Sequence, residues 1–252
     1  MIKILFSKHD FAVISIAGIL CGILLTFIEV PGDTNINLED AFLYARDGYI
    51  YLSDRCYSSD IFNCTFNLLI FIPLITKVFI KDYDTAKSFL FVRVKDVTDW
   101  YKYKILQSVI YCFFSSLIYN LTLLIILILR HFRADSPMLV IKYIALGILA
   151  GFLILFLIVS AGNTLSLIIK PHLSTAITMC ITVIIMGIAC VLNDGQIQFN
   201  ILINYFISWH MIMNSNSVFY YYPTWTYYGA VCIFIVIELV AGKHILKKSD
   251  YI

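Results

Sequence analysis

Charged residues are scarce in this chain of 252 residues. Asp, Glu, Lys and Arg make up 13% of it, whereas about 25% is usual in a soluble domain. Apolar residues make up 61% and the mean hydropathy is +0.88, so a folded sphere of this size has too little interior to hide them from water. The composition excludes a disordered chain, a water-soluble globule and a nucleic-acid-binding protein.

Motifs for catalysis and cofactor binding are also missing. The single Gly-Lys pair, Gly242-Lys243, has no glycine five residues before it, so the sequence lacks a phosphate-binding loop. The five histidines are far apart, no H-E-x-x-H or Cys/His cluster offers a metal site, and no G-x-S-x-G elbow is present. We therefore predict that the chain is not an enzyme and holds no cofactor.

Long uncharged runs are what the sequence has in quantity. A helix needs about 20 apolar residues to span a bilayer, and six runs approach that length. We predict an all-α membrane protein with six transmembrane helices in a single domain over residues 1–252. The predicted spans are residues 11–28, 66–80, 105–129, 139–169, 173–192 and 227–246.

The basic residues orient these spans. With a cytoplasmic N-terminus, 13 of the 18 Lys and Arg residues face the cytoplasm and five face outside, as the positive-inside rule requires. An even number of spans returns the chain to the same side. We therefore predict cytoplasmic N- and C-termini.

The longest polar segment is the outside loop, residues 31–63. Asn37 is the predicted N-cap of a short helix that begins at Leu38, has acids in its first turn and ends before Gly48. The loop has six acids and two arginines, and we favour a solvated cap on the outer surface over an acidic vestibule for a cationic cargo or partner. Cys56 and Cys64 are both on this side, where a disulfide is sterically feasible but is not decided by their spacing.

Two other segments between the spans are distinctive. The inside loop, residues 81–104, is basic and amphipathic, which fits either a segment that binds anionic headgroups or a docking element for a cytoplasmic partner. The stretch 196–225 is apolar but too broken to span the bilayer, so we predict two short re-entrant helices in the outer leaflet. For its aromatic residues we favour an interfacial belt over the lining of a cargo exit.

Small and polar residues share one face of the third predicted span. Such residues in a membrane helix usually face other helices, because close approach and hydrogen bonds replace the missing hydrophobic drive. We therefore favour a helix interface over a cargo path. Two further close contacts are predicted by the pairs Gly18/Gly22 and Gly147/Gly151. The residues of this face are Ser108, Cys112, Ser115, Ser116, Tyr119 and Asn120.

Glu238 is the one acid well inside a predicted span. A carboxylate at that depth is costly and is therefore a candidate functional group. It fits a polar anchor in the bundle, a dimer contact, a protonatable group, or a lower position from which it reaches Lys243 or the inner interface. We favour the lower position.

This layout resembles the permease subunit of ABC-2-type exporters. The shared features are six spans with both ends inside, a basic loop between spans two and three, and a broken amphipathic stretch before span six. Residues 82–85, Arg93, Trp100 and Lys104 look like that family's acidic-Gly-Thr, Arg, aromatic and Lys sequence around its coupling helix, with Asp84 where the family usually has Gly. Residues 167–172 resemble its inside turn between spans four and five.

The resemblance implies a half-transporter in the bacterial cytoplasmic membrane. A second permease chain, either another copy or a sister subunit, would pair with it, and a separate ABC ATPase subunit would hold ATP and Mg. The implied cargo is an amphipathic peptide of the toxin, bacteriocin or lantibiotic type. The alternatives are a stand-alone membrane protein, such as an immunity or accessory factor, and a permease for lipid-linked or drug cargo. The coupling helix that would dock the ATPase includes Ala86, Lys87, Phe89, Leu90, Arg93 and Lys95.

Overall fold

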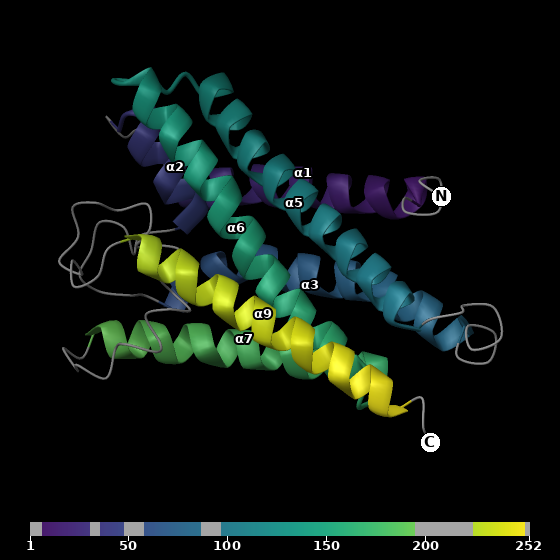
Figure 1. Cartoon of the computed structure of the whole chain (residues 1–252). Helices are drawn as coiled ribbons and strands as arrows, with labels where there is room; N and C mark the ends of the chain where they lie inside the picture. Colours follow the sequence, from purple (N-terminus) through teal and green to yellow (C-terminus); the bar gives the residue numbers. More distant parts are fainter. Residues whose placement is uncertain (1–6, 31–35, 48–57, 87–96, 195–223, 250–252) are drawn as a thin grey trace.

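The computed structural model describes residues 7–30, 36–47, 58–86, 97–194 and 224–249 (Figure 1). Every regular element within these residues is an α-helix, as predicted, and they contain no strand. The helices are α1 (Lys8–Glu29), α2 (Leu38–Asp47), α3 (Ser58–Ala86), α5 (Val97–Leu129), α6 (Pro137–Ser166), α7 (Pro171–Asp194) and α9 (Thr224–Ser249).

Each predicted span coincides with one helix, and the differences lie at the ends. The second span was expected at 66–80, but α3 extends past it on both sides and continues through Pro73. The third was expected to begin at Ile105, but α5 begins at Val97. Residues 81–86 and 97–104, which are the described part of the predicted inside loop, are therefore helical. Hydropathy marks only the apolar part of a helix, whereas its backbone hydrogen bonds continue into polar residues.

Among the described residues, four helices are long and apolar enough to cross a membrane, namely α1, α5, α6 and α9. In α3 and α7 the corresponding apolar stretches are shorter, Thr65–Phe79 and Pro171–Ile185. Large apolar side chains such as Phe27, Ile125 and Val236 are more than half exposed. Helices of this composition with apolar outer faces identify a membrane-embedded protein.

α5 contacts α1, α2, α3, α6 and α9, so these neighbours can be oriented against it. α1 runs parallel to α5, because Gly18 lies against Ile118 and Gly22 lies one turn further along, against Thr122. α6 runs antiparallel to α5. Its residue 148 meets residue 116 of α5, and its residue 163 meets residue 108.

The remaining helices continue this alternation. α3 runs antiparallel to α5, since Lys104 of α5 contacts Val78 near the end of α3. α9 runs parallel to α6, since Glu238 meets Ser160 and Gly242 meets Thr164. The start of α1, the end of α3, the start of α5 and the end of α9 consequently lie at one end of the bundle (Figure 1).

A small aromatic core joins the helices at that end. Phe79 of α3, Tyr101 of α5 and Leu246 of α9 are buried together, with Trp100 and Leu167 packed against them. A Cβ at residue 242 would collide with the Tyr101 hydroxyl, so a glycine there allows α5 to approach α9. We refer to these residues as the inner-end core.

The short helix α2 is buried within the bundle. Asn37 caps it as predicted, with its Oδ1 accepting a hydrogen bond from the Asp40 N–H at 2.9 Å. However, α2 packs against α1, α3, α5 and α6. The prediction of a solvated cap is therefore wrong for this helix. Its stripe of Leu38, Ala41, Phe42 and Ala45 is buried. Glu39, Leu43 and Arg46, which lie outside this stripe, are buried as well.

Candidate functional site

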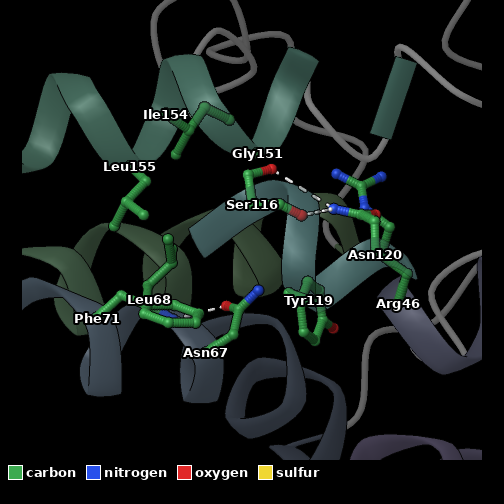
Figure 2. A pocket seen from close by; sticks show the side chains of 10 residues that line it. All are labelled: Arg46, Asn67, Leu68, Phe71, Ser116, Tyr119, Asn120, Gly151, Ile154 and Leu155. Atoms are coloured by element: carbon green, nitrogen blue, oxygen red, sulfur yellow. Dashed lines mark hydrogen bonds between the residues drawn. The ribbon is translucent and has the colours of Figure 1, made fainter. Parts of the chain in front are cut away.

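A polar cavity lies where α2, α3, α5 and α6 meet (Figure 2). It measures about 20 Å³, which is room for about one water molecule. Its polar lining residues come from α2, α3 and α5, and its apolar lining residues come from α3 and α6. We take this cavity and the polar side chains around it as the candidate functional site. The lining residues are Arg46, Asn67, Leu68, Phe71, Ser116, Tyr119, Asn120, Gly151, Ile154 and Leu155.

The predicted polar face of α5 points into the protein. None of its six residues is more than 5% exposed. Ser116 donates a hydrogen bond to the Ile148 carbonyl at 2.9 Å, and Asn163 donates to the Ser108 hydroxyl at 3.3 Å. Ser115 donates to its own helix, to the carbonyl of Tyr111. These contacts support the interpretation of the face as a helix interface.

Both predicted glycine pairs make close helix contacts, and both contact α5. On α6, a Cβ at residue 151 would lie 2.7 Å from the Ser116 hydroxyl oxygen, and one at residue 147 would lie 2.9 Å from Asn120 Oδ1. On α1, a Cβ at residue 22 would lie 2.8 Å from Thr122 Cβ. The glycines therefore allow α1 and α6 to approach two faces of α5, and on α6 they make space for polar side chains.

Arg46 brings a positive charge to this polar core. It lies in the last turn of α2 and is only 1% exposed. Its Nη2 donates to the Gly147 carbonyl at 3.4 Å, and its Nε lies 3.4 Å from where a Cβ of residue 147 would be. A buried charge is tolerated only where polar groups compensate for the lost water. Figure 2 shows Arg46 beside Asn120 at the edge of the cavity.

The other end of α2 is attached to the α5–α6 turn. The Glu39 carboxylate, 4% exposed, accepts hydrogen bonds from the backbone N–H of Ser136 at 2.6 Å and of Asp135 at 3.3 Å. Ser136 is the N-cap of α6 but makes no side-chain cap bond, so Glu39 supplies the negative group that a helix N-terminus favours. Asn37 also donates to the Asp135 carboxylate at 3.0 Å.

Glu238 lies between α9 and α6. The Ser160 hydroxyl donates to its carboxylate, and Glu238 is partly buried. This contact fits the polar anchor among the predicted alternatives, whereas the lower position near Lys243 or the inner interface stays a prediction. Glu238 acts as a polar anchor in the bundle, one helical turn away from the Asn163–Ser108 contact.

Several other predicted site residues lie outside the part of the chain that the structure describes. Ala86 is the last residue of α3. The rest of the predicted coupling helix, the partner cysteine Cys56 and the re-entrant stretch up to residue 223 are not described. The docking segment, the disulfide with Cys64 and the re-entrant helices therefore stay predictions. The undescribed coupling residues are Lys87, Phe89, Leu90, Arg93 and Lys95.

Two important residues of this site were not singled out in the sequence. Asn67 and Arg46 lie on different helices and meet α5 only in the folded bundle. The sequence gives no signal for Arg46, because α2 is amphipathic and Arg46 lies outside its apolar stripe, where a solvated charge is expected.

The described residues contain no group of three or more His, Cys, Asp and Glu side chains placed to hold a metal. No known protein family, curated protein or solved structure matches the chain.

Proposed function

We propose that this chain is the permease subunit of an ATP-driven exporter in the bacterial cytoplasmic membrane. In this proposal α1, α3, α5, α6, α7 and α9 are six spans, both termini are cytoplasmic, and the stretch 196–225 supplies re-entrant helices. The observation that carries the proposal is the alternation of the helices, which brings the ends of α3 and α9 and the start of α5 together (Figure 1). The exposed lysines Lys77, Lys102 and Lys243 all belong to these helix ends, which suits a cytoplasmic surface.

The ATPase subunit would dock at residues 86–95, between α3 and α5. The first turns of α5 contact α3, α6 and α9 through the inner-end core. Lys104, 2% exposed, also links α5 to α3, because its Nζ donates to the Val78 carbonyl at 3.3 Å and to Gln107 at 2.9 Å. A push on the docking segment would therefore reach α9 and α6 through packed side chains. ATP and Mg would bind to the ATPase, which supplies the energy.

The cargo would be an amphipathic peptide that passes between two permease chains. The polar cavity of this chain has room for about one water molecule, which is far too little for a peptide. A path would therefore form against a second permease chain, either another copy or a sister subunit.

The closed interior also favours a second candidate function. A stand-alone membrane protein, such as an immunity or accessory factor, needs no path through its bundle. Within the exporter class, lipid-linked or drug cargo would use the same architecture.

Copurification tests the proposal. The tagged chain is solubilised from the membranes of the source organism, and ATPase activity is measured with and without amphipathic peptides. We expect an ATPase to copurify and peptides to stimulate it. The double variant Phe89→Ala/Arg93→Ala should lose the ATPase but keep its amount in the membrane.

The matched control is Val236→Ala, which changes a 58% exposed side chain on α9 and should keep the ATPase. Normal ATPase binding by the double variant would contradict the docking assignment. No ATPase with the unaltered chain would favour the stand-alone protein.

A further inference from the structure

α2 fills only the outer half of the bundle. It begins at the α5–α6 turn, where the Leu38 N–H donates to the Arg133 carbonyl at 2.8 Å. It ends beside Gly147, eleven residues after Ser136, or about 16 Å along α6. A hydrocarbon core is about 30 Å thick, so α2 enters between the spans from one end and stops about half-way.

The surface on which α2 sits is polar at its deep end. Asn67, Ser116 and Asn120 line the cavity beside Arg46. Asn120 Oδ1 is buried and has no hydrogen-bond partner in the described structure. A polar surface of this kind is wetted when its cover leaves, whereas an apolar one stays dry.

The forces that hold α2 in place oppose one another. Burial of Phe42 and Leu43, both at most 1% exposed, stabilises the seated position. Burial of Glu39 and Arg46 costs solvation free energy, which both side chains recover in water. The hydrogen bonds at the outer end can also be exchanged for water. The seated and withdrawn positions are therefore closer in free energy than they would be for a wholly apolar helix.

We propose that α2 is a gate. It withdraws as one unit away from the polar cavity and opens a water-filled space bounded by α3, α5 and α6 on the side of the α5–α6 turn. The role of this space as the cargo exit rests on the proposed function. The movement of α2 itself does not require an ATPase.

Thiol labelling tests the movement. Single cysteines replace three alanines in a cysteine-free background, and intact cells receive a charged, membrane-impermeant thiol reagent. Ala134 is exposed in the α5–α6 turn, whereas Ala41 and Ala45 are 0% and 1% exposed on successive turns of α2. We expect Ala134→Cys to label at once and the two α2 cysteines to label slowly.

The substitution Glu39→Ala removes the link to α6. It should accelerate labelling at residues 41 and 45 alike, by about tenfold or more, because a charge-assisted contact is lost and the helix moves as a unit. Acceleration at residue 41 alone would show fraying of the helix end and would overturn the gate. No acceleration at either position would show a fixed wedge and would also overturn it.

A cysteine at Val159 of α6, which is 0% exposed and lies twelve residues beyond Gly147, checks that the bundle is intact and should stay unlabelled in every background. If this control cysteine labels in the Glu39→Ala chain, the milder Asn37→Ala replaces that substitution. Acceleration at residue 41 alone, or at neither residue 41 nor 45, would again overturn the gate. The labelling needs no ATPase, so its failure is distinguishable from a failed copurification.

Discussion

Arg46 and Gly147 depend on each other across the contact between α2 and α6. The guanidinium donates to the Gly147 carbonyl, and Asn120 approaches the same residue from α5. A side chain at position 147 would occupy the space between Arg46 and Asn120. The buried charge on α2 is therefore possible only because α6 has a glycine at this height.

Gly147→Ala should destabilise the protein by about 1–3 kcal/mol, since the added methyl group overpacks the site. Its Cβ would lie 2.9 Å from Asn120 Oδ1 and 3.4 Å from Arg46 Nε. Thermal unfolding in detergent measures the loss. The control is Gly229→Ala in α9, where no atom lies within 4 Å of the added Cβ. Equal melting temperatures for the two variants would contradict the prediction.

α5 and α9 represent two ways of holding a helix in this bundle. α5 is contacted on two faces through glycines, from α1 and from α6. α9 packs mainly on α6 and α5, and its opposite face is apolar and exposed, with Ile233, Ile237 and Val240 all at least 57% exposed. The contact of Ser160 with Glu238 is therefore a specific polar link between α9 and the rest of the bundle.

The link between α6 and α9 predicts the order of stability of two variants. Ser160→Ala alone should cost about 1–3 kcal/mol, because the carboxylate of Glu238 keeps its position but loses a donor. Adding Glu238→Leu should recover stability, since two apolar groups can replace a buried polar pair. Unfolding in detergent compares the single and double variants. Ile237→Ala, on the exposed face of α9, is the control. A double variant less stable than Ser160→Ala would refute the ordering.

At the scale of the whole molecule, α1 runs parallel to α5, whereas α3, α6 and α9 run antiparallel to it. The α5–α6 turn and the α6–α7 turn lie at opposite ends, because α6 runs between them as one helix of 30 residues. Such a helix is about 45 Å long, which exceeds the thickness of a hydrocarbon core. α6 is therefore long enough to cross the membrane, and we predict that the two turns face opposite sides of it.

Cysteine labelling checks this arrangement. Ala134→Cys, in the first turn, should react with an impermeant reagent in intact cells. Lys170→Cys, exposed in the second turn, should react only after permeabilisation. The orientation follows from the excess of Lys and Arg assigned to the cytoplasmic side. Labelling of both positions in intact cells would rule out a single crossing by α6.

The elements themselves were largely predictable. Each uncharged run coincides with a helix, and the cap at Asn37 marks the start of α2. Runs and caps are local, since they depend on residues within a few positions of one another. The helix ends were less predictable, as α3 and α5 show by continuing into polar sequence.

The site was predictable only in part. The polar face of α5 was identified from its periodicity, but Arg46 was assigned to a solvated outer loop. The partner of Glu238 was also missed, because Ser160 lies 78 residues away in the sequence. A single sequence contains no information on which distant residue will face a given side chain.

The sequence by itself determined that this is an all-helical, membrane-embedded chain, where its helices run, and which of their faces are small or polar. Composition and periodicity decide these properties because each depends on the solvent and on neighbouring residues in the chain. Only the tertiary structure decided which face meets which, that α2 is buried among the spans, and that Arg46 meets Asn120 beside a glycine. These contacts join residues that are far apart in sequence, so they are settled by packing of the whole bundle.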